Sequence, residues 1–179
     1  MKKNLKILHN FDIFPNNGIP KPKKYITRHT VKAIVKNKKG EIALVTNPIH
    51  KLFSLPGGGA EGKNLETEII RECREEINQR VEVLDVIGKI KEFRDRDSKK
   101  YITTCFVVKA VKKFKKDFRT EEEVKNGLSV VWVNNKKLIN IFKAQTKKVK
   151  DGKIDFYNTA FNIIRDSVFI NEYLSILKK

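Results

Sequence analysis

Runs of apolar, often β-branched residues separated by short polar segments predict β-strands along the middle of the chain. The runs cover residues 30–35, 41–46, 81–93, 101–111 and 128–133. The polar segment 37–40 ends in glycine, which predicts a hairpin between the first two strands. A second polar segment, 94–98, predicts the turn between the two longer strands.

Apolar residues spaced three and four apart predict helices between and after these strands. In the first helix Leu65, Ile69, Cys73 and Ile77 form one apolar stripe. Residues 135–142 and 156–177 predict two more helices towards the C-terminus. The chain is therefore expected to mix α and β structure, with no internal repeat.

The beginning of the chain differs from the rest in composition. Residues 1–27 are basic and contain Pro15, Pro20 and Pro22, which interrupt regular helix. We interpret 1–27 as a basic N-terminal lead-in segment and 28–179 as one domain. A length of 179 residues with 40% hydrophobic content suits a single soluble globular domain with a sizeable core.

The most informative chemistry is a glycine loop that directly precedes the first helix. Residues 57–59 are all glycine, and Glu72, Glu75 and Glu76 share one face of the helix that follows. Like charges at this spacing destabilise a helix, and neither Arg71 nor Arg74 is expected to lie in the middle of the cluster. Magnesium is bound by carboxylates together with substrate phosphates, so it would compensate the charge. The alternative is an ordinary solvated acidic face.

The segment 57–79 resembles a Nudix box, whose pattern is G-x5-E-x7-R-E-U-x-E-E-x-G-U with U aliphatic. Gly57, Arg71, Glu72, Glu75 and Glu76 fall in register. The resemblance extends weakly over residues 28–177. It implies an α+β fold of the Nudix type, in which a mixed β-sheet lies between helices as an α/β/α sandwich. It also implies hydrolysis of a nucleoside diphosphate linked to another moiety.

Three positions depart from the family pattern. Asn78 stands where the family has glycine, but asparagine tolerates the left-handed conformation that ends helices. Gln79 replaces an aliphatic residue. Lys63 replaces the glutamate that helps to hold the box arginine in the family, so it is expected to weaken the site. Glu68 is one turn before Glu72 and is either a substitute carboxylate or an ordinary surface residue.

The resemblance also implies roles for individual residues. The expected metal is Mg²⁺, with Mn²⁺ as the alternative, and its expected ligands are Glu72, Glu75 and Glu76. The expected catalytic residues are Glu75, Glu76, Arg71 and Glu122, the last from an acidic run, 121–123, that has a solvated surface as its alternative. Glu92 is a second candidate for the general base. The residues expected to bind substrate are Gly57, Gly58, Gly59 and Arg94.

Cysteine usage and the absence of apolar runs bound the cellular setting. Cys73 and Cys105 fall in a predicted helix and a predicted strand, which favours reduced, buried thiols rather than a disulfide framework. We find neither a signal peptide core nor a transmembrane run, so a cytoplasmic location without membrane contact is expected. The sequence leaves monomer and homodimer open.

The formal net charge of +18 raises a question about partners. A strongly basic protein attracts polyanions, although here the lysines are spread along the chain rather than gathered in one motif. The expected partner is a small nucleotide-derived substrate, with weak nucleic-acid binding as a secondary property. Two alternatives stay open: a catalytically weak Nudix-fold module that binds nucleotide or RNA, and a pyrophosphohydrolase of RNA 5′ ends.

Overall fold

The computed structural model describes residues 3–16, 18–47, 51–62, 64–119, 121–125, 127–154 and 156–178. Its strands are β1 (Asn4–Leu8), β2 (Ile26–Lys36), β3 (Ile42–Asn47), β4 (Leu52–Ser54), β5 (Gln79–Arg94), β6 (Lys99–Lys113) and β7 (Ser129–Val133). Its helices are α1 (Asn10–Ile13), α2 (Leu65–Ile77), α3 (Glu121–Lys125), α4 (Asn135–Lys150) and α5 (Tyr157–Ile176), with a 3-10 turn, η1, at Asp95–Asp97.

The strands form one mixed sheet in the order β1-β5-β6-β2-β3-β4, and β7 pairs with β3. β5 and β6 pair antiparallel across η1, and Ser98 ends this turn in the left-handed conformation. β2 lies parallel to β6 along its whole length, whereas β2 and β3 meet only beside their connecting turn. This early separation leaves one edge of β2 available to another segment of the chain.

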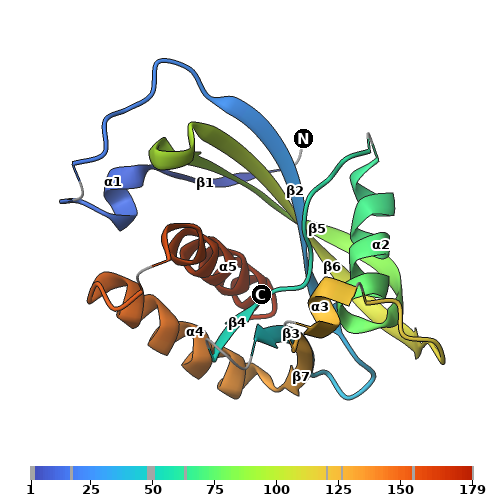
Figure 1. Cartoon of the computed structure of the whole chain (residues 1–179). Coiled ribbons are helices and arrows are strands. Elements are labelled where there is room, and N and C mark those ends of the chain that lie inside the picture. The colour runs from blue at the N-terminus through green and yellow to red at the C-terminus, as the bar shows by residue number, and fades with distance from the viewer. Residues whose placement is uncertain are drawn as a thin grey trace.

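Helices cover both faces of the sheet, with α2 on one face and α4 and α5 on the other (Figure 1). Alternation along β2 explains the two cores, because successive side chains of a strand point to opposite faces. Val31, Ala33 and Val35 pack in the core that also contains Ile69, Cys73 and Ile77 of α2. Ile34 packs in the other core, together with Phe161 and Phe169 of α5. The expected α/β/α sandwich is confirmed.

Most predicted elements are present, with small differences in length. The hairpin at 37–40, the long β5–β6 pair and the predicted C-terminal helix are all confirmed. α4 is longer than predicted and continues to Lys150. Both cysteines are buried free thiols, as expected. Among the described residues, none of the helices combines the length and apolarity needed to cross a bilayer.

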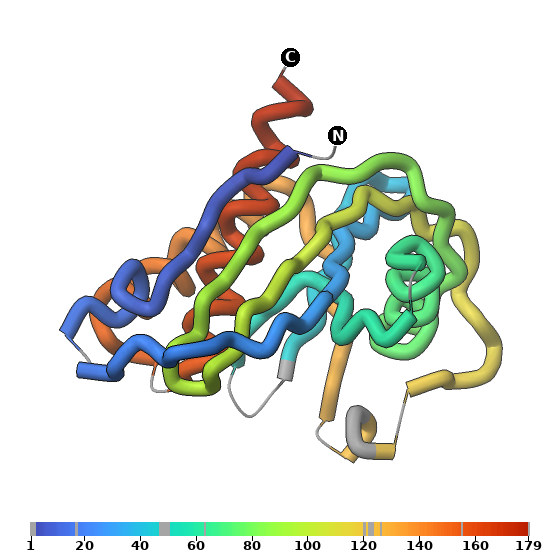
Figure 2. Tube along the Cα trace, turned by 90° about the horizontal axis from the view of Figure 1, so that it is seen from above, coloured from blue at the N-terminus to red at the C-terminus, as the bar shows by residue number. Residues whose placement is uncertain are grey.

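The lead-in segment contains regular structure that the sequence analysis did not predict. β1 pairs with β5 in parallel, beside it in the view of Figure 2, and Leu8 is buried in the core on the α5 side. The prolines that interrupt helix come after this strand, so they do not prevent it. The boundary at residue 28 stays a prediction. The short strand β4 was also not predicted, and the prediction that 121–123 form a loop was wrong, because they begin α3.

Candidate active site

The glycine loop runs along the open edge of β2. The amide of Val31 donates to the carbonyl of Gly58 at 3.0 Å, and the amide of Ala33 donates to the carbonyl of Pro56 at 2.9 Å. Gly57 has a φ of +126°, and a Cβ there would lie 2.2 Å from the carbonyl oxygen of Val31. No other residue fits this position, because both the backbone conformation and the contact exclude a side chain.

Side chains from both faces of the sheet hold the start of this loop. The amide of Leu55 donates to Oδ2 of Asp166, on α5, at 2.9 Å. Nζ of Lys32, on β2, donates to the carbonyls of Leu55 and Gly57. The sequence analysis missed Lys32 as a site residue. In a lysine-rich chain nothing in the local sequence distinguishes it, since its role depends on how the loop lies against β2.

Local capping sets where α2 begins and ends. The side chain of Asn64 accepts hydrogen bonds from the amides of Glu66 and Thr67, at 3.0 and 3.3 Å, which satisfies donors that a helix N-terminus otherwise leaves unpaired. At the other end Asn78 has a φ of 52° in the left-handed region. The expectation that Asn78 ends the helix as the family glycine would is confirmed.

Two glutamates of α2 face the glycine loop. Oε2 of Glu76 accepts a hydrogen bond of 2.6 Å from the amide of Gly57. Glu72 is only 8% exposed, and a Cβ added at Gly58 would lie 2.8 Å from its Oε2. The absence of side chains on the loop therefore lets these carboxylates approach the backbone closely.

Arg71 occupies the middle of the acidic cluster, which corrects the expectation that no arginine would lie there. Its Nη1 donates to Glu75 at 2.6 Å. Its Nη2 donates to Glu72 at 2.6 Å, to Glu68 at 3.0 Å and to the carbonyl of Gly59 at 3.2 Å. A guanidinium group has several donors in one plane, so a single arginine can hold helix carboxylates and the loop together.

The electrostatics of the cluster are uneven. Burial raises the pKa of Glu72, and the attraction of Arg71 only partly opposes this effect. The hydrogen bond from Arg71 lowers the pKa of Glu68. Burial lowers the pKa of Arg71 itself, but the carboxylates around it more than reverse this, so its pKa is raised. Glu72 is thus a buried carboxylate whose charge Arg71 does not fully compensate.

The donor set suits a hard divalent cation, since carboxylate oxygens are the ligands that Mg²⁺ and Mn²⁺ prefer. Glu72, Glu75 and Glu76 would hold such an ion, and the raised pKa of Glu72 indicates that further positive charge would stabilise this site. Among the described residues, no three acidic, histidine or cysteine side chains converge on one point. Their oxygens are arranged around Arg71 and the amide of Gly57 instead.

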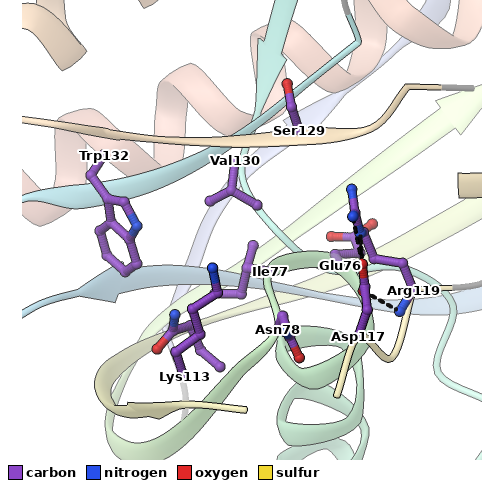
Figure 3. A pocket seen from close by; sticks show the side chains of 10 residues that line it. Glu76, Ile77, Asn78, Lys113, Asp117, Arg119, Ser129, Val130 and Trp132 are labelled. Carbon is purple, nitrogen blue, oxygen red and sulfur yellow. Dashed lines mark hydrogen bonds and ion pairs between the residues drawn. The ribbon is translucent and has the colours of Figure 1, made fainter. Parts of the chain in front are cut away.

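Glu76 also lines a cavity of about 380 Å³ at the C-terminal end of α2 (Figure 3). Trp132 of β7 and Lys113 of β6 line it too, together with the loop residues Asp117 and Arg119. Nη2 of Arg119 lies 2.5 Å from Oδ2 of Asp117 and lowers the pKa of this carboxyl to about 2. The cavity thus brings one box glutamate next to a fixed ion pair and an aromatic ring.

Some predicted site residues cannot be placed. The side chains of Glu122 and Glu123 lie outside the described part of the structure, and so do Lys63 and His50. The backbone of 121–125 forms α3, which precedes β7. The catalytic role of Glu122 therefore stays a prediction.

Arg94 lies on the other face of the sheet from α2. Its guanidinium group stacks on Tyr101 at 4.2 Å from the ring centroid and donates to Asn158 and Asn162 of α5, both at 2.8 Å. Glu92 is completely buried and accepts from Arg94 at 3.2 Å, so it serves as an internal counter-ion. This position does not suit the general-base role considered for Glu92.

A second cavity, of about 270 Å³, opens on the α5 side of the glycine loop. We call it the α5 cavity; its lining includes Gly57 to Gly59 and the side chains of Arg28, Lys32, Arg94, Asn158, Asn162 and Arg165. Of these side chains, the sequence analysis had predicted only Arg94 to bind substrate. The asparagines come from α5, which is far from the loop in sequence, so only the tertiary fold brings them together.

Comparison with known proteins supports the same site. The model of the NUDIX domain matches residues 26–155. A solved NUDIX hydrolase from Nitrosomonas europaea is similar with a TM-score of 0.53 and 17% identity, over 65% of this chain and 78% of that one. The MutT protein from Methanosarcina mazei Go1 aligns with 23% identity and a TM-score of 0.47, over 66% and 84% of the two chains. No match was found among the curated proteins.

Proposed function

The chain belongs to the NUDIX domain family, and from this premise we propose that it is a metal-dependent pyrophosphohydrolase. Its substrate would be a nucleoside diphosphate linked to another moiety, and the reaction would break a phosphoric anhydride bond. The observation that carries the proposal is the assembly of Arg71, Glu72, Glu75 and Glu76 against the glycine loop. A surface with solvated acidic residues would not need a buried glutamate or a glycine at 57.

The residues of the site would divide the work as follows. A bound Mg²⁺ or Mn²⁺ would neutralise pyrophosphate oxygens and lower the pKa of a water molecule. Arg71 orients Glu72 and Glu75 by hydrogen bonds, while Glu76 fixes the amide of Gly57. The glycines leave the loop backbone accessible to a phosphate group. Glu75, Glu76 and Glu122 are the candidates to accept the proton from water.

The first prediction concerns Glu76→Gln. Glutamine keeps an oxygen that can accept the Gly57 amide, so the loop should stay in place, but the charge that would bind metal is lost. We expect weaker binding of Mg²⁺ in a calorimetric titration and a fall in turnover of about a hundredfold, as when a group that stabilises transition-state charge is removed. Turnover would be followed by phosphate release from nucleotide sugars, oxidised nucleoside triphosphates, dinucleoside polyphosphates and triphosphorylated RNA.

Glu66→Gln is the matched control, since Glu66 is an exposed carboxylate in the first turn of the same helix. Its metal affinity and turnover should equal those of the wild type. Equal Mg²⁺ affinity in the wild type and Glu76→Gln would contradict the metal site. A wild type that releases phosphate from none of the substrates with either metal would contradict the enzymatic function.

The net charge of +18 favours a second candidate within the same reaction class, pyrophosphate removal from RNA 5′ ends. An RNA substrate would use the general positive charge of the surface as well as the site itself. Triphosphorylated RNA is therefore included in the screen. Turnover of RNA ends alone would select this candidate.

A further inference from the structure

The α5 cavity presents hydrogen-bond donors from buried cations. Arg94 and Arg165 are each 3% exposed, and both line the cavity. Within the described residues, Nε of Arg94 has no hydrogen-bond partner. Nη2 of Arg165 likewise makes no hydrogen bond, although it lies 2.9 Å from Asp166 in an ion pair. Unpaired buried donors are costly in a folded protein, so such a pair at a cavity indicates a ligand that accepts hydrogen bonds.

Two asparagines of α5 add further donors. Oδ1 of Asn162 accepts from Arg94 at 2.8 Å and from Arg165 at 3.0 Å, and Oδ1 of Asn158 accepts from Arg94 at 2.8 Å. An arginine only donates, so it fixes the orientation of each amide with the oxygen towards the guanidinium. The NH₂ groups of both asparagines are therefore turned away from the arginines. They act as donors at the cavity that these residues line.

The charge of the lining has one sign. Arg28, Lys32, Arg94 and Arg165 all contribute to it, and none of the described lining residues is acidic. Glu92 pairs with Arg94 and lies 3.6 Å from Arg165, but it is buried behind them and does not line the cavity. Burial lowers the pKa of Arg165, yet Asp166 and Glu92 more than reverse this effect, so this residue stays charged. The ligand that matches such a surface is an anion.

The glycine loop separates this basic cavity from the acidic face of α2. Gly58 contacts Glu72, whereas a Cβ at Gly59 would lie 3.4 Å from Nη2 of Arg28. A neighbouring cavity shares Asn162 and is lined by Phe53, Phe156 and other apolar side chains. Cationic donors thus adjoin an apolar and aromatic surface, which suits a phosphate group attached to a nucleoside.

We propose that the α5 cavity is a phosphate-binding subsite, which holds the phosphate next to the nucleoside and directs the nucleoside towards Phe53 and Phe156. This inference rests on the proposed function for the identity of the ligand. It goes beyond that function because Asn158, Asn162 and Arg165 follow the segment 26–155 that defines the family. Substrate choice is then set by α5 rather than by the glycine loop and α2.

The test measures binding without turnover. Calorimetry in excess EDTA and low salt would compare the four common ribonucleoside 5′-monophosphates with their nucleosides, so that neither metal nor hydrolysis contributes. For at least one base, the monophosphate should bind the wild type about tenfold more tightly than the nucleoside, the scale of a charge-assisted hydrogen bond.

Asn162→Asp is the decisive variant. The aspartate oxygen still accepts from Arg94 and Arg165, so thermal stability should be equal to or above that of the wild type. The donor NH₂ is replaced by a charged oxygen, so the preference for the monophosphate should disappear while nucleoside binding is retained. Arg28→Gln removes an exposed cation of the lining and should reduce the preference severalfold. Arg80→Gln, an equal change at an exposed position of β5, should leave it unchanged.

Two results would overturn the subsite. One is a wild type that binds no monophosphate more tightly than its nucleoside. The other is an Asn162→Asp variant that keeps the wild-type preference. Both are independent of turnover, so the subsite can fail while the metal-dependent hydrolysis holds, and the hydrolysis can fail while the subsite holds.

Discussion

Arg71 organises the candidate active site because one side chain contacts three glutamates and the glycine loop. The family pattern places a glutamate at position 63, where this chain has lysine. Lys63 lies outside the described residues, and its effect on the site stays a prediction. Glu68 accepts from Arg71 at 3.0 Å and from the amide of Gly62 at 3.2 Å. We infer that Glu68 takes part in holding Arg71 and is more than an ordinary surface residue.

This inference predicts that Glu68→Ala reduces activity. Without Glu68, Arg71 loses one of the groups that fix its position, and Glu72 and Glu75 lose orientation with it. Partners that orient metal ligands typically contribute 10–100-fold, so we expect a fall of about tenfold in turnover. Phosphate release on the best substrate would measure it. Glu66→Ala is the control, since it removes a carboxylate from the same helical turn without a contact to Arg71. Equal activities of the two variants would show that Glu68 has no such role.

The sequence predicted part of this residue-level picture. Gly57, Glu72, Glu76 and Asn78 have local signatures, because their roles depend on spacing along one loop and one helix. The central position of Arg71 had no such signature, since its direction depends on the path of the glycine loop beside β2. Lys32 and the asparagines of α5 were missed for the same reason. Their contacts join segments that are distant in sequence.

At the scale of elements, β1 shows how a strand can escape prediction from the sequence. It is short, it lies at the edge of the sheet, and most of its side chains are exposed or half-buried. Its pairing with β5 depends on Gly88, which has a φ of +154° and lies at a register shift. A Cβ at Gly88 would lie 2.7 Å from the carbonyl oxygen of Lys3 and 2.8 Å from Cγ of Leu5. The close approach of β1 therefore requires glycine at this position.

We predict that Gly88→Ala separates β1 from β5. The added methyl group should cost about 1–3 kcal/mol, as overpacking usually does. Urea unfolding would measure this loss, and hydrogen exchange should show faster exchange at residues 4–8 with unchanged exchange in α2. Gly59→Ala is the control for stability, because its Cβ would meet only Arg28 at an ordinary contact distance of 3.4 Å. Unchanged protection of residues 4–8 in Gly88→Ala would refute the role of this glycine.

At the scale of the whole molecule, the net charge of +18 is distributed over several elements. α4 alone exposes Lys136, Lys137, Lys143, Lys147, Lys148 and Lys150. Arg94 and Arg165, by contrast, are buried and hydrogen-bonded within the fold. The protein therefore has two kinds of positive charge: mobile lysines on the surface, and fixed arginines at the α5 cavity. They should respond differently to salt.

The last prediction separates the enzyme from an RNA-binding module. Exposed lysines that contact several phosphates of a single strand release counterions, so the logarithm of RNA affinity should fall with the logarithm of salt concentration by about 0.7 per phosphate contacted. Fluorescence anisotropy with unrelated single-stranded RNAs should show weak, sequence-independent binding at about 50 mM salt that is lost near 150 mM, where screening acts within about 8 Å. A nucleoside monophosphate held by buried arginines should lose far less affinity over this range, because it contacts few charges and displaces few counterions. RNA binding that stays tight at 150 mM salt, in a protein that turns over no nucleoside diphosphate derivative, would instead favour the binding module.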